Sequence, residues 1–373
     1  MTQGFPILTK LTDPATFAGN IFSQNLDFKQ GMVQQYNLTF EHQIPGDVVL
    51  TVGYAGSHST HILVDQMNLN VKSPSACGTV PGYTLGCGLS TTTVFYPQFG
   101  NIQNANDIGS ARYDSFQVKA ETKNARHGLY ALLGYTYARA FDSGFSDGLG
   151  TSSGATYFPL PGTAKTDWAL SQINLNHNFT ASVIYGLPFG RGKKFGSDWS
   201  GPVNAILGGW QANVIEKITS GFPVFIVTST NASGVNFTNN TTNFNRPNQI
   251  SDPLQGGAVA ANPTCLAPAE VGTINHWFNP CAFVDPPTGE LGAANRTPLY
   301  GPGFVNTDFS VNKFFPLSFR EGTDIEFRAE FFNLFNHPQF YLPVADRTSS
   351  NFGAITETVN NPRLVQFALK LRF

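Results

Sequence analysis

Nine short segments in which side chains alternate with a period of two restrict the fold of this chain more than any other feature. Between residues 115 and 123, Ser, Gln, Lys and Glu side chains alternate with Phe, Val, Ala and Thr side chains. Successive side chains of a β-strand point to opposite faces, so this pattern predicts a strand with one charged face. The nine predicted strands are residues 33–43, 48–55, 115–123, 129–141, 179–187, 210–219, 305–315, 323–335 and 365–373.

The connections between these segments alternate between short and long. The short or moderate ones are residues 44–47, 124–128, 188–209 and 316–322, and the long ones are residues 56–111, 142–177, 220–304 and 336–362. Outer-membrane barrels have short periplasmic turns and long extracellular loops, and a soluble β-sandwich hardly ever gives such strict alternation. The pattern also predicts that the chain ends on the periplasmic side.

The composition indicates that much of the surface does not face water. Charged residues make up 12% of the chain, about half of the roughly 25% typical of soluble proteins, and 33 residues are Phe. The mean hydropathy is nevertheless -0.12, and the uninterrupted apolar runs, such as Val224–Val227, are far shorter than the roughly 20 residues of a helical span. A closed barrel is the spanning structure that fits both observations.

We therefore expect an all-β, transmembrane, antiparallel up-and-down β-barrel, of which the C-terminal part with about nine to ten strands is present. Its surroundings would be outer membrane lipid, in the cell outer membrane of a Gram-negative bacterium. The formal net charge of -2 gives no reason to expect a nucleic-acid partner.

The last segment of the chain alternates most regularly. Its apolar face ends on an aromatic residue at the C-terminus, which resembles the signal that the barrel-assembly machinery recognises, and the alternative is an ordinary amphipathic strand. The residues that would carry the signal are Phe367, Leu369, Leu371 and Phe373. The barrel-assembly machinery is thus an expected partner.

Four cysteines form two local pairs, Cys77 with Cys87 and Cys265 with Cys281. Neither pair has the CxxC spacing of a zinc site. We interpret both as loop disulfides, which would place these loops in an oxidising compartment, and free thiols are the alternative.

Charged side chains alternate along the eighth predicted strand and recur on its neighbours. A catalytic role would require a carboxylate in a perturbed environment, whereas the polar lumen of a barrel normally carries such ladders. We expect no catalytic, cofactor or metal site, and no enzyme. The predicted lumen-facing charges are Lys313, Asp324, Glu326, Arg328, Glu330, Lys370 and Arg372.

Several motifs, which together span most of the chain from about residue 30, are similar to those of a known receptor family. They are Gln34-Gln35-Tyr36-Asn37-Leu38 before Pro45-Gly46, Val52-Gly53-Tyr54-Ala55-Gly56-Ser57, Trp277-Phe278-Asn279-Pro280, Gly301-Pro302-Gly303-Phe304 with Asn306, Asp308 and Lys313, and Phe327-Arg328-Ala329-Glu330-Phe331-Phe332-Asn333-Leu334-Phe335-Asn336. The chain thereby resembles the C-terminal barrel halves of Oar-like TonB-dependent receptors.

This resemblance implies an outer-membrane transporter of roughly 22 strands whose lumen is closed by an N-terminal plug and which is energised through TonB. We find no plug domain, TonB-contact segment or signal peptide, so we expect residues 1–373 to be the C-terminal part of such a receptor and Met1 not to be the true start. The TonB complex would then be reached through the missing plug.

Three functions remain to be compared. The first is TonB-dependent uptake or passage of an unidentified ligand, with contacts in the loop from residue 220 to 304, because binding residues concentrate on loops carried by rigid scaffolds. The second is an outer-membrane adhesin or surface-binding β-barrel without active transport. The third, an outer-membrane hydrolase, is the weakest, because no suitable group of catalytic residues has convincing spacing.

Overall fold

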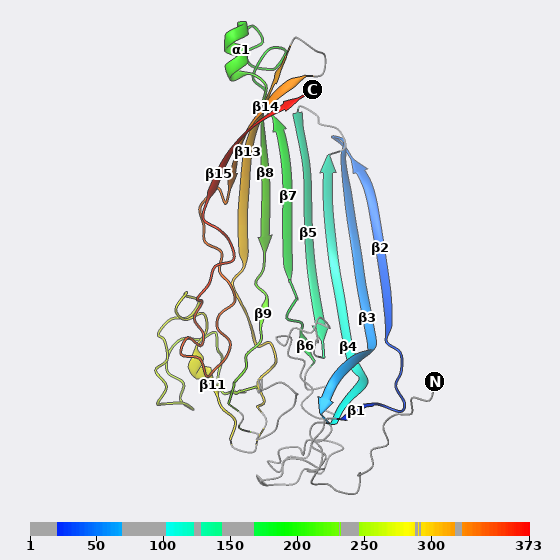
Figure 1. Ribbon diagram of the computed structural model, residues 1–373, viewed down its shortest axis with the longest axis vertical. Helices are drawn as coiled ribbons and strands as arrows, with labels where there is room; N and C mark the ends of the chain where they lie inside the picture. The colour runs from blue at the N-terminus through cyan, green and yellow to red at the C-terminus, as the bar shows by residue number, and fades with distance from the viewer. Residues whose placement is uncertain are drawn as a thin grey trace, which may run out of the picture.

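One long, twisted antiparallel sheet forms the body of the protein in the computed structural model (Figure 1). The structure describes residues 21–68, 102–122, 128–143, 168–230, 232, 246–287, 290, 292–317 and 323–373. Nine strands follow one another in the sheet in chain order. They are β2 (Met32–Ile44), β3 (Val48–Asn68), β4 (Ile102–Thr122), β5 (Leu129–Asp142), β7 (His177–Gly186), β8 (Trp210–Thr219), β13 (Phe304–Pro316), β14 (Asp324–Phe332) and β15 (Leu364–Arg372).

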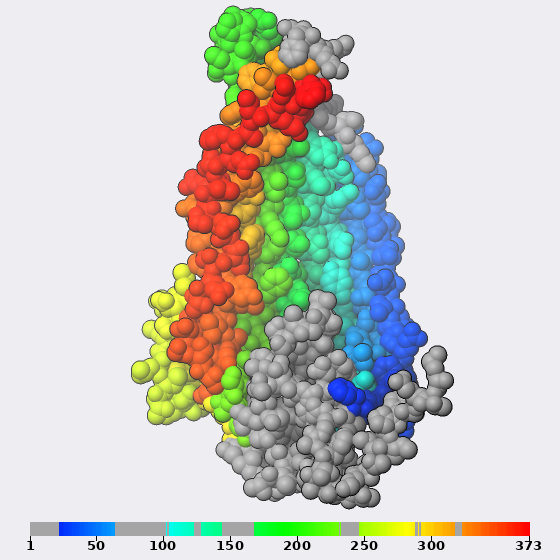
Figure 2. Space-filling model, in the orientation of Figure 1, coloured from blue at the N-terminus to red at the C-terminus, as the bar shows by residue number. Residues whose placement is uncertain are grey.

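These nine strands confirm the predicted all-β, up-and-down arrangement, although the sheet is not closed. Figure 2 shows the strands near the N-terminus in blue along one flank and the C-terminal residues in red along the other. Two short strands join the sheet beside this path: β1 (Ile21–Gln24) pairs in parallel with β4, and β6 (Ala169–Leu170) pairs with β5. The tenth predicted strand was expected within residues 1–30; in the described part of that range, β1 lies beside β4 and not at an edge of the sheet, and residues 1–20 lie outside the described residues.

The strand ends that short connections join lie at one end of the sheet, which we call the turn end, and the strand ends that long connections join lie at the opposite loop end (Figure 1). The turn end carries the only α-helix within the described ranges, α1 (Gly201–Leu207). Among the described residues, no helix is long and apolar enough to span a membrane.

Strands β3 and β4 are 21 residues long each and extend far beyond the predicted segments. The paired extension runs through Ser57, His58 and Ser59 opposite Tyr113, Arg112 and Ala111. These residues lack the apolar alternation that identified the strands, so the sequence pattern ended where the hydrogen-bonded ladder continues. The prediction that residues 56–111 form one long connection was therefore wrong at both ends of that range.

The register gives the sheet one polar and one apolar face, since directly paired residues share a face. Lys119 lies opposite Thr51 and Gly134 on the polar face, and Glu326 lies opposite Lys370. On the apolar face, Phe327 lies opposite Leu369 and Leu38 lies opposite Tyr54. Leu38 and Leu369 are 60% and 73% exposed, which suits side chains that face lipid.

The prediction that Lys313 is one of the lumen-facing charges was wrong. It lies opposite Trp210 and Phe327, so it belongs to the apolar face, unlike the six other charges of the predicted set. The side chain is buried, and its ammonium donates to the backbone carbonyls of Ile206, at 3.2 Å, and Gly208. It also lies over the ring of Trp210. Lys313 therefore fastens the end of α1 to the sheet.

Replacing Lys313 by methionine is expected to loosen α1 by about 2 kcal/mol, because hydrogen bonds to a charged donor contribute about 1.5–3 kcal/mol. Amide hydrogen exchange of residues 201–209 would measure this change. Lys194→Met, which changes an exposed lysine of the same turn, is the matched control and should leave exchange unchanged. Equal protection in the two variants would contradict the role assigned to Lys313.

Candidate functional site: a disulfide-linked cap at the loop end

Two long connections fold together at the loop end into a compact unit, which we call the cap. It consists of the described residues between 220 and 303, which join β8 to β13, and of residues 333–363, which join β14 to β15. Two small ladders shape it. β9 (Pro223–Val224) pairs with β12 (Leu299–Tyr300), and β10 (Asn248–Gln249) pairs with β11 (Phe283–Val284).

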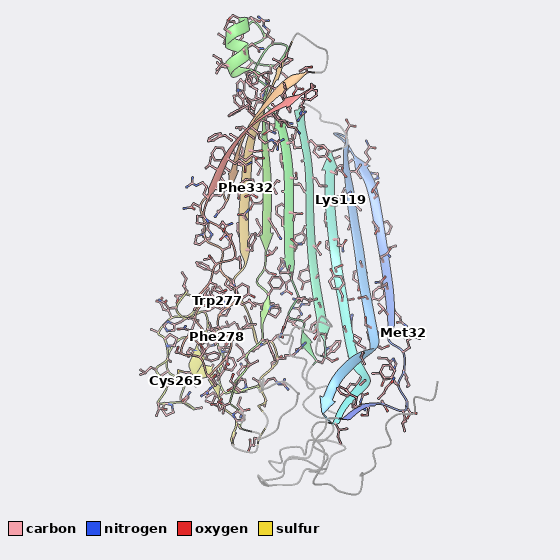
Figure 3. All side chains as sticks on the ribbon, viewed as in Figure 1. Met32, Lys119, Cys265, Trp277, Phe278 and Phe332 are labelled. Carbon is pink, nitrogen blue, oxygen red and sulfur yellow. A yellow bond between two sulfur atoms is a disulfide. The ribbon has the colours of Figure 1, made fainter. Side chains whose placement is uncertain are left out.

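The cap has its own hydrophobic core, which both connections build. Figure 3 shows Trp277 and Phe278 within it, at the end of the molecule opposite α1. The ring of Phe278 makes edge-on contacts with Phe283 and Phe352, at centroid distances of 5.8 and 5.0 Å. The buried residues are Val224, Ile226, Phe278, Ala282, Phe283, Ala294 and Leu299, and Trp277, Leu342, Ala345 and Phe352 pack against them.

Backbone hydrogen bonds join the two connections directly. The amide of Val227 donates to the carbonyl of Ala345 at 3.0 Å, and the amide of Trp277 donates to the carbonyl of Gly353 at 2.7 Å. Buried backbone N–H and C=O groups need hydrogen-bond partners, and here each connection supplies partners to the other. The two connections therefore fold as one unit. The cap therefore presents a preformed surface.

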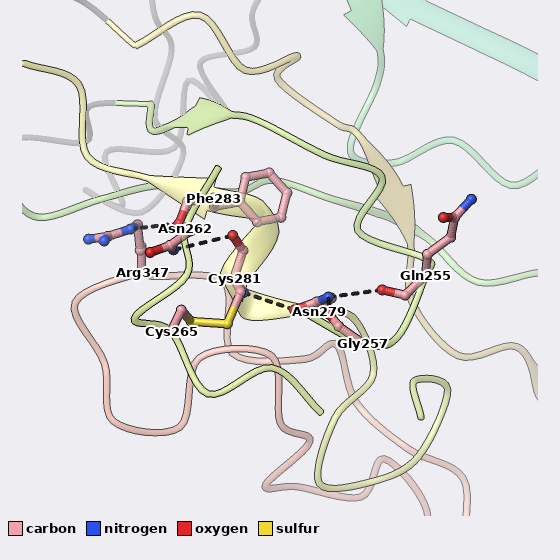
Figure 4. Close-up of a disulfide and its surroundings, with 8 residues drawn as sticks. All are labelled: Gln255, Gly257, Asn262, Cys265, Asn279, Cys281, Phe283 and Arg347. Atoms are coloured by element: carbon pink, nitrogen blue, oxygen red, sulfur yellow. Dashed lines mark hydrogen bonds between the residues drawn. A yellow bond between two sulfur atoms is a disulfide. The ribbon is translucent and has the colours of Figure 1, made fainter. Parts of the chain in front are cut away.

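A disulfide between Cys265 and Cys281 lies at the edge of this core (Figure 4). Cys281 is fully buried in the short helix η3 (Pro280–Ala282), whose first turn is capped by the Asn279 side chain. That side chain accepts from the Cys281 amide at 3.0 Å and donates to the carbonyl of Gln255 at 2.9 Å. The other predicted pair, Cys77 with Cys87, lies outside the described residues.

Replacing both Cys265 and Cys281 by alanine is expected to destabilise the cap by about 3 kcal/mol, the loop-closure value for a ring of about 15 residues. Amide exchange of the cap, measured with and without reductant, would report the change. The double variant should exchange equally under both conditions, whereas the unmodified protein should exchange faster when reduced. An unmodified protein insensitive to reductant would contradict this expectation.

A buried ion pair fastens the cap to the sheet. Arg296, in the cap, pairs with Asp142 at the loop end of β5, and both side chains are at most 7% exposed. The same guanidinium donates to the Asp142 carbonyl at 2.9 Å, across 154 residues of sequence. Nearby, the Thr297 hydroxyl donates to the Leu170 carbonyl at 2.9 Å. The cap is thus held against the rim of the sheet by polar contacts in a dry environment.

Two further carboxylates hold the connections of the cap together. Arg347 pairs with Asp285 and also donates to the carbonyl of Phe283 at 3.1 Å. Asp346 accepts hydrogen bonds from Ser229 and Thr348. Burial opposes ionisation of Asp346, but these hydrogen bonds outweigh it and hold the pKa of Asp346 below its ordinary value.

The predicted charge ladder appears on the polar face near the turn end. Glu326 is only 2% exposed and lies between Arg328, at 2.7 Å, and Arg372. Arg328 also reaches Glu330 at 3.5 Å. The register places Asp324 and Lys370 on the same face. That this face lines a lumen remains a prediction, as does the assembly signal on β15.

The motif at the end of β14 has a structural role. Asn333 and Asn336 have positive φ values of 51° and 52°, which asparagine tolerates better than most residues. The Asn333 side chain accepts from the backbone amide of His337 at 3.0 Å, and the backbone amide of Asn333 donates to the Asp308 carboxylate at 2.9 Å. The strand consequently ends at Phe332, three residues before the predicted end at residue 335.

Most residues that form the cap were not predicted from the sequence. Arg296, Asp285 and Arg347 lie in segments without regular alternation and find their partners across long distances in the chain. The sequence signals in this region were the Cys265–Cys281 pair and the motif that contains Trp277 and Phe278, two residues that build the core. In the described part of the chain, no three His, Cys, Asp or Glu side chains are arranged to hold a metal ion.

Comparison with known families identifies this architecture. A model described as the outer membrane beta barrel domain matches residues 1–366. The chain belongs to the outer membrane β-barrel domain family. Membership places it in the cell outer membrane of a Gram-negative bacterium, so the turn end is periplasmic and the cap is extracellular. The apolar face of this barrel domain is then the one that meets lipid.

Solved structures similar to this outer membrane β-barrel domain include proteins with little sequence identity. The outer membrane transporter YddB from Escherichia coli is 9% identical, with a TM-score of 0.46. The match includes 95% of this chain and 34% of the YddB chain. The FrpB iron transporter from Neisseria meningitidis is 12% identical, with a TM-score of 0.39. The match includes 94% of this chain and 32% of the FrpB chain. The chain thus spans about a third of their length. No curated protein matches the chain.

Proposed function

We propose that this chain is the C-terminal barrel part of a TonB-dependent outer-membrane transporter whose cap contacts the ligand. The observation that carries the proposal is the cap itself, because two long extracellular connections share one buried core and are fastened to the rim by Arg296 and Asp142. A preformed surface lowers the entropy lost when a ligand binds. Its ligand is unidentified.

The charges on the polar face support the proposal that a ligand passes across the membrane through this barrel. Glu326, Arg328 and Arg372 form a paired network on that face, and charges in a membrane barrel are stable where they face a polar interior. In the proposed transporter, these groups would face a lumen or a plug within it. No catalytic role is proposed for them.

Strand direction supports a larger barrel. Strands β2 and β15, at the two edges of the sheet, both run from the loop end to the turn end (Figure 1). Antiparallel closure requires neighbours of opposite direction, so an odd number of further strands must stand between these edges. We infer that residues 1–373 form one part of the barrel, and that a plug reached by TonB belongs to the remainder.

An adhesin or surface-binding barrel is the second candidate, and exposed apolar side chains on the cap favour it. Leu266 is 96% exposed, Leu254 is 57% exposed and Ile274 is 49% exposed. Such side chains would contribute to docking of a macromolecule without requiring transport.

Uptake from a mixture of peptides and glycans separates the two candidates. Cells with and without the gene would be incubated with the mixture, and its depletion followed by mass spectrometry before and after a protonophore removes the energy supply. A transporter depletes certain components only with the gene and only in energised cells. Binding that is unchanged by the protonophore, together with no intracellular accumulation, would contradict transport and favour the adhesin.

A further inference from the structure

A pocket of about 680 Å³ lies on the apolar face towards the loop end, away from the polar face and the cap core. Strands β3, β4 and β5 supply most of its wall. The lining residues are Tyr54, Arg112, Asp114, Ser115, Phe116, Tyr137, Arg139, Phe141 and Trp168. A pocket that combines aromatic rings, two arginines and a carboxylate on a lipid-facing surface is unusual, because charges are costly there.

The register places seven of the nine lining side chains on the apolar face, the exceptions being Ser115, on the polar face, and Trp168, which precedes β6. Phe116 lies opposite both Tyr54 and Tyr137, on the same face as Leu38 and Phe40. Asp114 lies opposite Arg139. The pocket therefore opens to the surroundings of the barrel and not to its interior, so a ligand passing through a lumen would not meet it.

The charges of the pocket leave an excess of positive charge. Arg112 pairs with Asp114 at 2.6 Å, and the hydroxyls of Tyr54 and Tyr36 donate to the same carboxylate. Asp114 neutralises one of the two arginines, and both Arg112 and Arg139 remain exposed. Guanidinium groups bind phosphate through two parallel hydrogen bonds, so the pair forms a suitable anion site.

Exposed aromatic rings form the rest of the pocket. Phe116 is 45% exposed, Tyr137 is 38% exposed and Trp168 is 40% exposed. Trp168 stacks on Phe141 with a centroid distance of 6.1 Å. These rings offer a firm apolar surface for acyl chains beside the arginines.

The position along the strand places the arginines at the outer leaflet. Arg139 lies ten residues beyond Leu129, where β5 begins at the turn end. At about 3.3 Å per residue and a strand tilt of about 40°, this is a rise of roughly 25 Å, the height of the apolar band of such barrels. Arg112 and Arg139 are therefore at the level of lipid headgroups in the extracellular leaflet.

We propose that this pocket binds a phosphorylated, acylated glycolipid of the outer leaflet, with Arg112 and Arg139 on its phosphate and the aromatic rings against its acyl chains. The charge complementarity and the continuity of the pocket with the lipid-facing surface support this occupant. The site is separate from ligand contact at the cap, and its existence does not depend on transport.

Binding of bis-phosphorylated lipid A to the full protein in detergent, followed by native mass spectrometry, tests the proposal. Dephosphorylated lipid A, phosphatidylglycerol and inorganic phosphate are the comparison probes. The variant that combines Arg112→Gln and Arg139→Gln should weaken lipid A binding about tenfold or more. The control that combines Lys193→Gln and Lys194→Gln removes the same charge at the turn end and should bind normally.

Heat-modified gel mobility would show whether each variant still forms a folded barrel, and Arg139→Lys provides a second comparison in which the charge is kept. We expect this variant to bind lipid A more tightly than Arg139→Gln. Undiminished binding by a folded Arg112→Gln, Arg139→Gln variant would overturn the proposal. So would equal affinity for dephosphorylated lipid A or phosphatidylglycerol.

Discussion

Replacing Arg296 by alanine should release the cap from the rim of the barrel, with a loss of about 3–5 kcal/mol, the typical effect of removing one member of a buried ion pair. The Asp142 carboxylate would lose the guanidinium that faces it while remaining buried. The Asp142 carbonyl would lose a hydrogen bond as well. Because the pair joins the cap to β5, the effect should concentrate at this junction and spare the strands below.

Amide hydrogen exchange of cap residues in the folded barrel is the measurement for this variant. Arg363→Ala, which changes an exposed arginine of the same cap, is the matched control and should have little effect. Combining Arg296→Met with Asp142→Leu should recover much of the loss, since the buried charge is then removed with its partner. If Arg296→Ala exchanged like the control, the ion pair could not be what holds the cap.

Replacing Phe278 by alanine is expected to unfold the cap core, at a cost of about 3–5 kcal/mol for a buried aromatic residue. Phe278 is fully buried and contacts Phe283 from one connection and Phe352 from the other. A cavity at this position separates the two connections instead of merely loosening one. The bond between the Trp277 amide and the Gly353 carbonyl should then open together with the core.

Limited proteolysis from the outside of intact cells would detect this change, because an opened cap exposes backbone that proteases can cut. Leu266→Ala is the control, since Leu266 belongs to the same connection but is 96% exposed. We expect its cleavage to match that of the unmodified protein. Equal resistance of Phe278→Ala would mean that the cap does not depend on a shared core.

The strands were predictable because each carries its own signal. Alternation in residues such as Val311, Lys313 and Phe315 fixes which side chains share a face, and antiparallel pairing extends that assignment to neighbours. The same alternation places Lys313 on the apolar face, because its side chain points to the same side as those of Val311 and Phe315. The error came from grouping charges by type instead of by position along the strand.

The cap was not predictable for the opposite reason. Its core residues stand singly in irregular segments, and Phe278 and Phe352 become neighbours only because β13, β14 and β15 bring their connections together. Arg296 and Asp142 are likewise joined by the arrangement of strands and not by spacing in the sequence. Periodicity reports local geometry, so contacts between distant loops leave no comparable pattern.

The shared direction of β2 and β15 also limits how copies of this chain can associate. Barrels of this kind insert with their turns on the periplasmic side, so every copy in one membrane has the same vertical orientation. If β2 of one copy met β15 of the next, the two strands would run in parallel, which an antiparallel wall does not accommodate. Direct pairing of β2 in one copy with β15 in the next is therefore excluded from an antiparallel pore, and the strand that pairs with either edge must run from the turn end to the loop end.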